Sequence, residues 1–329
     1  NFGSYRTISS GENIPEEVTT LFLLGGETLT DYDCFQLDQF LVRGGKAFIA
    51  ANAIRVMINP QYGLFAYPQD SKPLNLLASY GISINKDIIG DSDSYNPFQQ
   101  RQGFFVEQYR YPIWPKIKST NINLKHPAVS EQSGLNLFWP SSVSFDDKIK
   151  KNVTVMMTTT PNSWALKDNF RLDIQSYRFP VQKAEKAFTM AVSFEGEIES
   201  FYKDKEIPKS EKSDVTFTGS IVNKGKTQMI VVGNDWFLWD NLYGENEQLF
   251  TVNSLDFLSK DSSLIKIRNK GKFDKPLDKA LNQQVLGLWK NIIITFTTFI
   301  VPLLFVALAL VMNILRKKKN NLFVQELKN

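Results

Sequence analysis

An uncharged apolar run near the carboxyl end constrains this sequence more than any other feature. The run extends from Ile292 to Leu315 and contains 24 residues. About 20 apolar residues in a helix are enough to cross the hydrocarbon core of a bilayer. Trp289 stands just before the run, where amphipathic rings favour the membrane interface. The pattern predicts a transmembrane helix over residues 289–315, because a buried core helix of this length would be unusual in a chain of otherwise ordinary composition.

Four consecutive basic residues, Arg316–Lys319, follow the run directly. Positive charge beside a membrane helix stays on the cytoplasmic side. We therefore expect a basic cytoplasmic tail at 316–329, an extracytoplasmic (periplasmic) domain at 1–288, and localisation in the inner (cytoplasmic) membrane. The positive excess of the tail accounts for the whole formal net charge of +4, so a nucleic-acid-binding surface is not indicated on the domain.

Polar residues inside the run predict a packing surface within the membrane. Thr295 and Thr298 carry hydroxyls that can bond back to helix carbonyls, and Pro302 predicts a mild kink. Such a single span is typical of a helix that packs on another membrane subunit as well as on lipid.

The chain starts at Asn1 with Asn-Phe-Gly and shows neither an initiator Met nor a signal peptide. We therefore expect an upstream segment, an N-terminal span or a cleaved signal, that carries the domain across the membrane.

The first part of the sequence alternates strand and helix patterns. Residues 18–24 form a short apolar run closed by Gly25-Gly26, which is typical of a strand covered on both faces. Thr30–Asp33 resembles a capping box, and the helical spacing that follows ends at Gly44-Gly45. Residues 47–51 then predict a second strand. Strand, helix and strand in this order predict a βαβ unit with a parallel strand pair.

Later patterns extend the same fold class. Apolar spacing predicts helices over 73–80, 245–257 and 277–288, and other apolar or alternating runs predict strands, among them 153–159, 187–198, 215–222, 228–233 and 264–267. We expect a three-layer α/β domain with a mostly parallel, Rossmann-like or class I glutamine-amidotransferase-like sheet and some antiparallel pairing. One C-terminal transmembrane helix is expected to follow it.

Candidate catalytic residues are few, because the chain has one cysteine and one histidine. Cys34 lies inside the first predicted helix and lacks the sharp strand-to-helix elbow of a nucleophile. His126 stands in a predicted loop, and a single histidine makes a poor metal site. We therefore expect Cys34 and His126 to have packing roles, and we expect neither a metal nor a cofactor. The alternative is an extracytoplasmic hydrolase or amidase that uses Cys34 or His126.

Two further motifs are candidates for ligand binding. Gly225-Lys226-Thr227 resembles the end of a P-loop, but the glycine spacing is wrong and a strand pattern follows, which favours a hairpin turn. Trp236 and Trp239, with Tyr243, follow the strand predicted at 228–233. They either pack beneath the helix at 245–257 or form a ligand or partner surface, since open α/β sheets bind at the carboxyl ends of their strands.

Several segments in order resemble one known family, the GldG-like ABC-transporter auxiliary family. The segments are Asp38–Lys46 (DQFLVRGGK), Thr158–Trp164 (TTTPNSW), Val231–Asp235 (VVGND), Asn253–Leu258 (NSLDFL) and Leu264–Lys270 (LIKIRNK). The family pattern departs at Thr160–Asn162, Asn234 and Trp236. A membrane helix with a basic tail closes the family pattern, and members usually carry a further N-terminal part.

The resemblance implies a non-catalytic subunit that works with an ABC permease and a separately encoded ATPase. It implies no active-site residue, and we expect two copies per transporter. Some relatives serve gliding motility and associated export. The domain would engage a substrate or an envelope partner, and the span would pack on the permease. A module that binds glycan or lipid through Trp236 and Trp239 is a further alternative.

Overall fold

The computed structural model describes residues 5–259 except 60, 62, 103, 104, 169, 171 and 173–182, and residues 294–314 except 301, 304, 306, 309 and 313. The chain divides into two compact units, Asn1–Arg268 and Asn269–Asn329. The strand predicted at 264–267, the helix predicted at 277–288 and the tail at 316–329 lie outside the described residues. The domain boundary at 288 stays a prediction.

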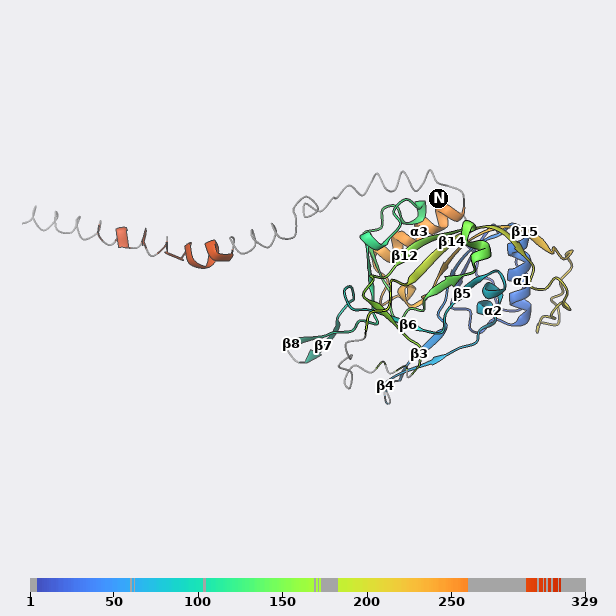
Figure 1. Ribbon diagram of the computed structural model, residues 1–329, viewed down its shortest axis with the longest axis horizontal. Helices are drawn as coiled ribbons and strands as arrows, with labels where there is room; N and C mark the ends of the chain where they lie inside the picture. The colour runs from blue at the N-terminus through green and yellow to red at the C-terminus, as the bar shows by residue number, and fades with distance from the viewer. Residues whose placement is uncertain are drawn as a thin grey trace, which may run out of the picture. The chain divides into compact units, whose positions relative to one another are not determined.

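A mixed five-stranded sheet forms the centre of the first unit (Figure 1). Its strand order is β1-β2-β15-β14-β12, with the bounds Thr20–Leu24, Lys46–Ala50, Lys224–Val232, Thr189–Glu199 and Val153–Thr158. Strands β1, β2 and β15 run parallel, as expected for the first βαβ pattern, whereas β14 and β12 join antiparallel.

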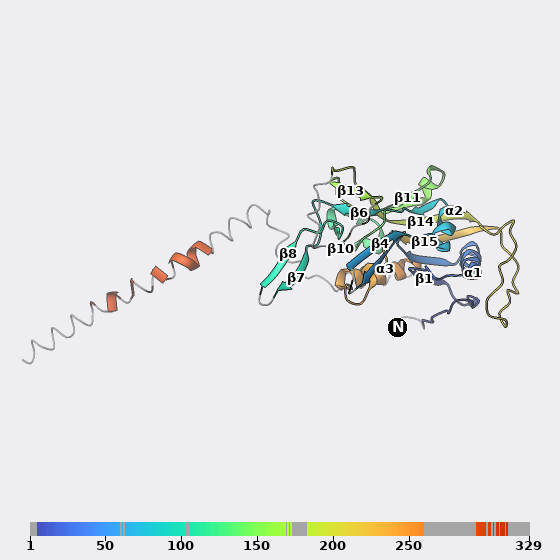
Figure 2. The ribbon, with the colours of Figure 1, turned by 90° about the horizontal axis from the view of Figure 1, so that it is seen from below.

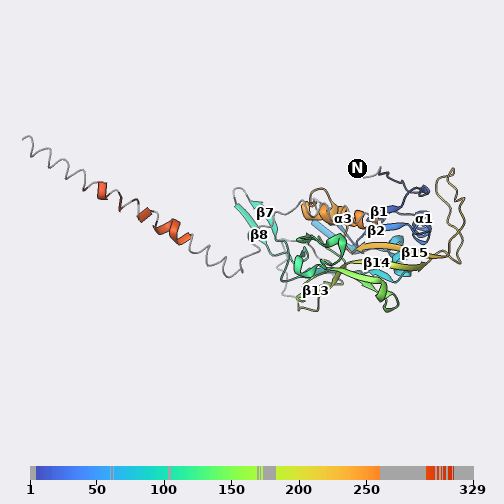
Figure 3. The same cartoon turned by 90° about the horizontal axis from the view of Figure 1, so that it is seen from above.

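The remaining described strands form five separate antiparallel pairs. These are β3 (Ile54–Asn59) with β4 (Gly63–Pro68), β5 (Ile82–Ile84) with β11 (Val143–Phe145), β6 (Ile88–Asp91) with β13 (Ser163–Leu166), β7 (Phe98–Gln102) with β8 (Phe105–Tyr109), and β9 (Lys116–Lys118) with β10 (Gly134–Asn136). The β7–β8 hairpin and the connection from β14 to β15 extend away from the central sheet (Figures 2 and 3).

This pairing corrects the predicted fold class. A three-layer domain with a mostly parallel, Rossmann-like sheet is wrong, because only two of the strand pairs among the described residues are parallel. The physical reason is that long connections, such as the one from β12 to β14, let a strand enter the sheet in either direction. A short αβ pattern fixes direction only for the strands that it joins.

Helices cover both faces of the central sheet. Helix α1 (Asp31–Val42) and helix α2 (Lys72–Ser79) pack on the face that carries Ala47 and Ile49, and α3 (Glu245–Leu258) packs on the face that carries Phe48 and Ala50. The predicted helices at 73–80 and 245–257 are confirmed. Short 3-10 turns occur at Ser119–Asn121, Pro127–Val129, Asp147–Asn152 and Trp236–Leu238.

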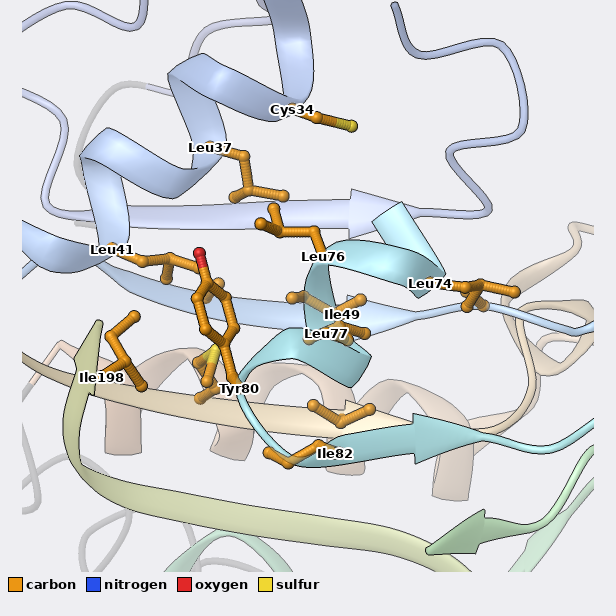
Figure 4. Packing of buried hydrophobic residues seen from close by; sticks show 14 of the residues in the cluster. Cys34, Leu37, Leu41, Ile49, Leu74, Leu76, Leu77, Tyr80, Ile82 and Ile198 are labelled. Atoms are coloured by element: carbon orange, nitrogen blue, oxygen red, sulfur yellow. The ribbon is translucent and has the colours of Figure 1, made fainter. Parts of the chain in front are cut away.

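The ends of α1 follow from its sequence. The Thr30 hydroxyl accepts from the Asp33 amide at 3.2 Å, and an Asp33 carboxylate oxygen accepts from the Thr30 amide at 2.8 Å, which completes the expected capping box. Gly44 ends the helix at φ 94°, in the left-handed region that favours glycine. Figure 4 shows Cys34, Leu37 and Leu41 on successive turns of α1, with Leu76 and Tyr80 of the α2 region nearby.

The strand predicted at 215–222 is absent from the described structure, and a side chain takes the place of a partner strand. The Gln39 side chain donates to the Val222 carbonyl at 3.1 Å and accepts from the Val222 amide at 2.9 Å. Val215, Phe217 and Val222 still pack on the α1 cluster, so the apolar residues are used without a sheet ladder. Hydrophobic pattern alone cannot distinguish these two outcomes.

The predicted transmembrane helix is also corrected. Among the residues that the structure describes, no helix combines the length and the apolar character needed to cross a bilayer. The described part of the run includes the π-helical turn Phe296–Ile300. Thr295, Thr298 and Pro302 are helical and exposed. This finding contradicts the span at 289–315 and the inner-membrane localisation inferred from it.

Candidate functional site

The parallel strands β1, β2 and β15 end at one edge of the central sheet. Leu24 pairs with Ala50, and Ala50 pairs with Val232, so the three strands finish level with one another. The Gly25 amide donates to the Ala50 carbonyl at 2.8 Å, and the Ala51 amide donates to Val232 at 3.1 Å. Loops at such an edge commonly carry ligand-binding residues.

Two buried asparagines hold these loops together. The Asn234 side chain donates to the Phe138 carbonyl at 2.7 Å and to the Asn52 side-chain oxygen at 3.2 Å. Asn52 in turn donates to the Trp139 carbonyl at 3.3 Å. These amides replace backbone pairing where the strands end, so their role is to fix the loops.

Asp235 is the chemically unusual residue of this edge. Its Oδ1 atom is buried and has no hydrogen-bond partner among the described residues. Burial raises the pKa of Asp235 to about 6, the negative charge of Glu27 adds to the rise, and the backbone amides of Asp235 and Trp236 oppose it. Gly25 stands next to the carboxylate at φ 71°, and a Cβ there would lie 3.3 Å from Asp235 Oδ2.

Glu27 carries the second charge of the edge. It forms an ion pair with Arg55 of β3 at 2.8 Å and accepts a hydrogen bond from Gln69 at 3.3 Å. Because Arg55 already compensates Glu27, Asp235 is the uncompensated acid of this cluster in the described part of the chain.

A row of tryptophans leads from the core to the surface at the same edge. Ring centroids are 5.4 Å apart for Trp114 and Trp139, 5.1 Å for Trp139 and Trp236, and 4.8 Å for Trp236 and Trp239, all edge to face. Trp239 is 45% exposed and Tyr243 is 40% exposed. Edge-to-face packing holds these rings in place and leaves the last one exposed to solvent. We define the carboxyl-edge site as Glu27, Arg55, Asp235, Trp236, Trp239 and Tyr243.

The β3–β4 hairpin adds exposed apolar side chains that the sequence analysis missed. Met57 faces Phe65 across the hairpin, and Arg55 faces Tyr67, so these four residues share one face. Met57, Phe65 and Tyr67 are all exposed, while Val56 on the opposite face is buried. The alternation of residues 54–59 and 63–68 around a Pro- and Gly-containing turn was the available sequence signal.

A comparison with known proteins identifies the family. A family model described as "ABC-type uncharacterized transport system" matches residues 4–261. The chain belongs to this family. The match confirms the resemblance to ABC-transporter auxiliary proteins that the motifs indicated.

Individual relatives of this ABC-type transport family member are distant. An uncharacterized protein of Borreliella burgdorferi is 29% identical over 215 residues, which cover 64% of this chain and 41% of the relative. The chain therefore spans less than half of the length of that relative. Among solved structures, the mmIFT52 N-terminal domain is similar at 12% identity and a TM-score of 0.40, with 73% of this chain and 77% of that chain covered. A putative ThuA-like protein from Bacteroides uniformis reaches 11% identity and a TM-score of 0.33, with 73% and 69% covered.

The remaining candidate residues of this ABC-type transport family member lie apart. Cys34 is buried in the α1 cluster on one face of the central sheet. His126 packs on Phe257 of α3 at 4.5 Å between ring centroids, on the opposite face. Burial raises the pKa of the Cys34 thiol to about 12, and burial lowers the pKa of His126 to about 4. A Cys34–His126 dyad is therefore excluded.

The Gly225-Lys226-Thr227 motif lies inside strand β15. Gly225 pairs with Ile198 of β14, and a Cβ at Gly225 would lie 1.8 Å from the Val42 carbonyl oxygen. The glycine is thus needed for backbone packing against the end of α1. A strand in this position offers no loop of amides to hold phosphate.

Proposed function

We propose that this chain is a non-catalytic auxiliary subunit of an ABC-type transport system, and that its carboxyl-edge site binds another subunit of that system. The family match over residues 4–261 is the observation that carries the proposal. The partners proposed are an ABC permease and a separate ATPase. Strand pairing of the P-loop-like motif Gly225-Lys226-Thr227 supports the proposal that a separate subunit carries the ATPase.

The composition of the carboxyl-edge site supports a protein partner. Exposed tryptophan and tyrosine are the residues that most often contribute large binding energies at interfaces. Trp239 is held by Trp236, so little side-chain freedom is lost on binding. The exposed face of the β3–β4 hairpin supplies further apolar surface, with Met57, Phe65 and Tyr67.

Two steps test the proposal. The chain is first co-expressed with an ABC permease and ATPase from the same source and purified in mild detergent. A stable complex is expected, and failure of either subunit to co-purify would refute the transporter role. A photo-crosslinking residue is then placed at Trp239, with Leu124 as the control, because Leu124 is similarly exposed at 43% and lies in the His126 loop. Crosslinks from Trp239 and not from Leu124 are expected, and equal yields would refute the assignment of the site.

The stoichiometry and the biological process are separate predictions. Two copies per transporter would appear as the mass of the purified complex. A role in gliding motility would appear as a motility defect on deletion of the gene.

Glycan binding is a second candidate, favoured by the exposed indole of Trp239 in a loop cluster that also holds Glu27, Arg55 and Gln69. Sugars stack on such rings and bond to carboxylate and amide groups nearby. Titration of the tryptophan fluorescence with soluble oligosaccharides tests this function. A saturable change that Trp239→Ala abolishes would support it, and an unchanged spectrum would exclude it.

A further inference from the structure

A cavity lies along α1, away from the carboxyl-edge site. Its volume is about 350 Å³, and it is bounded by residues 14–18, by the Gln36–Arg43 side of α1 and by residues 219–220. Pockets that bind small ligands start at about 300 Å³. The cavity is therefore large enough for a compact ligand of the size of an amino acid or a dipeptide.

Gln36 lies in the wall of this cavity. Its side chain is only 6% exposed, and the Ile14 amide donates to its Oε1 at 3.3 Å. The Nε2 atom is buried, so a ligand in the cavity does not reach it. The polar contacts that the cavity offers to a ligand therefore come from its charged residues.

Arg43 brings a positive charge that is already held in place. Its guanidinium donates to the Ser220 carbonyl at 2.6 Å and lies 5.3 Å from the centre of the Phe217 ring. A Cβ at Gly219 would come within 2.8 Å of Arg43 Nη2, so this glycine gives the guanidinium its room. A fixed guanidinium has donors left for a carboxylate and loses little freedom on binding it.

Glu16 brings the opposite charge to the same cavity. Neither Glu16 nor Arg43 forms an ion pair within 4 Å among the residues that the structure describes. The two charges share one cavity without neutralising each other. The apolar side chains of Ile14, Val18 and Phe40 line the rest of the wall.

We propose that the α1 cavity binds a small zwitterion, an α-amino acid or a dipeptide with an apolar side chain. The ligand carboxylate pairs with Arg43, and its ammonium group pairs with Glu16. The side chain packs on Ile14, Val18 and Phe40. Glu16 repels a ligand that carries only a negative charge, and Arg43 repels a ligand that carries only a positive charge. Charge complementarity therefore selects a molecule that carries both charges. This inference is independent of the proposed transporter role.

Isothermal titration calorimetry of the full chain tests the ligand class. The probes are leucine and alanyl-leucine, with acetyl-leucine and leucinamide as analogues that each lack one charge. Saturable binding of leucine or of alanyl-leucine is expected, and each blocked analogue should bind leucine's site at least tenfold more weakly. Binding of leucine alone identifies the amino acid as the ligand, and preference for alanyl-leucine identifies the dipeptide. The proposal fails if neither zwitterion binds at about 10 mM, ten times the Kd of a weak site, or if the blocked analogues bind equally well.

Matched variants locate the site. Arg43→Met and Glu16→Gln should each weaken binding about tenfold, whereas Arg55→Met in the β3–β4 hairpin should leave it unchanged. Glu16 and Arg43 are exposed, so their variants should fold as the native protein does. Unaltered binding in both the Glu16 and the Arg43 variants would overturn the assignment.

Discussion

Two carboxylates of this protein, Asp38 on α1 and Asp235 after β15, lie in opposite chemical surroundings. Asp38 is completely buried and accepts four hydrogen bonds, from the Tyr80 hydroxyl at 2.6 Å, the Ser200 hydroxyl at 2.6 Å, the Phe201 amide at 2.8 Å and the Gln39 side chain at 3.1 Å. Burial and the charge of Asp38 raise the pKa of Tyr80, which keeps its hydroxyl a donor. Asp235 has a buried oxygen without a partner in the described part of the chain.

The difference separates an acid whose oxygens are all satisfied from one that keeps a buried oxygen unsatisfied in the described part of the chain. Every oxygen of Asp38 is engaged in joining α1 to the region after α2 and to the end of β14, so it holds elements together. Asp235 stabilises no such junction, and its unsatisfied atom lies where the parallel strands end. Buried polar groups are normally satisfied, and an exception needs an explanation. The predictions below test this contrast, starting with the largest effect.

Asp38→Ala should be strongly destabilising. The substitution leaves the Tyr80 and Ser200 hydroxyls and the Phe201 amide without their acceptor, and each buried unsatisfied group costs about 1–3 kcal/mol. We expect the free energy of unfolding in urea to fall by at least about 3 kcal/mol. Asp70→Ala is the control, because Asp70 pairs with Lys86 at the exposed surface and should change stability by less than about 1 kcal/mol. Equal effects of the two substitutions on stability would contradict the structural role of Asp38.

His126 should make the protein less stable in acid. Its pKa falls from 6.5 in the unfolded chain to about 4 in the folded protein, because burial disfavours the charged ring. The unfolded chain therefore binds a proton first, and stability is lost as the pH falls from about 6.5 to about 4. At about 1.4 kcal/mol per pKa unit, the loss is roughly 3.5 kcal/mol at most. Urea unfolding across this pH range should show the loss as a pH-dependent difference in stability between the native protein and His126→Gln.

Asp235 should act in the opposite direction over nearly the same pH range. Its pKa rises from 3.8 to about 6 on folding, so its contribution is fully present below pH 3.8 and is lost as the pH rises through about 6. Asp235→Asn should stabilise the protein at pH 7 by as much as about 3 kcal/mol and change little at pH 4. The titrations of His126 and Asp235 have opposite effects on stability and partly cancel in the native protein. The effect of Asp235→Asn should therefore be measured in a His126→Gln background. A destabilised Asp235→Asn variant at pH 7 would show that the carboxylate has a structural partner.

Trp239→Ala and Trp236→Ala should separate binding from stability. Trp236 packs between Trp139 and Trp239, so its loss should cost about 3 kcal/mol of stability. Trp239 is half exposed, and its loss should cost about 1 kcal/mol or less. Partner affinity, measured by titration of the purified subunits, should still fall at least tenfold in Trp239→Ala. Retained affinity there would place the interface elsewhere.

Cys34 should give the smallest effect. The thiol is buried and its pKa is raised to about 12, so the reactive thiolate is scarce at neutral pH. We expect alkylation of the folded protein to be at least about a hundredfold slower than that of the urea-unfolded chain. Cys34→Ala should leave complex formation unchanged. Rapid alkylation of the folded protein would reopen the possibility of thiol chemistry.

Local patterns in the sequence predicted the local structure well. The Thr30–Asp33 capping box, the Gly44 helix end and the β1–α1–β2 unit all follow from residues that are close in sequence. The direction of β14 depends on its pairing with β15, and β5 pairs with a strand about 60 residues further along the chain. A single sequence reveals neither contact. Gln39 completing the backbone at Val222 is a contact of the same long-range kind.

Only part of the candidate site could be predicted from the sequence. Trp236, Trp239 and Tyr243 were found because aromatic residues follow a strand end, although their exposure could not be predicted. Asp235 and Glu27 could not be predicted, because an isolated Asp or Glu in a loop is normally solvated and their partial burial arises from contacts that are distant in the sequence. The cavity along α1 was missed because residues 14–18 and 219–220 meet only in three dimensions.

The row of indoles from Trp114 to Trp239 also has an optical consequence. Rings about 5 Å apart at fixed, nearly perpendicular angles couple their electronic transitions, so the near-ultraviolet circular dichroism should carry an exciton signature. Trp139 is buried and Trp239 is exposed, so the excited state of the exposed ring is shared with the interior. Binding of a ligand or partner at Trp239 should therefore change the signal of the buried indoles as well. The near-ultraviolet circular dichroism can then report binding without an added label.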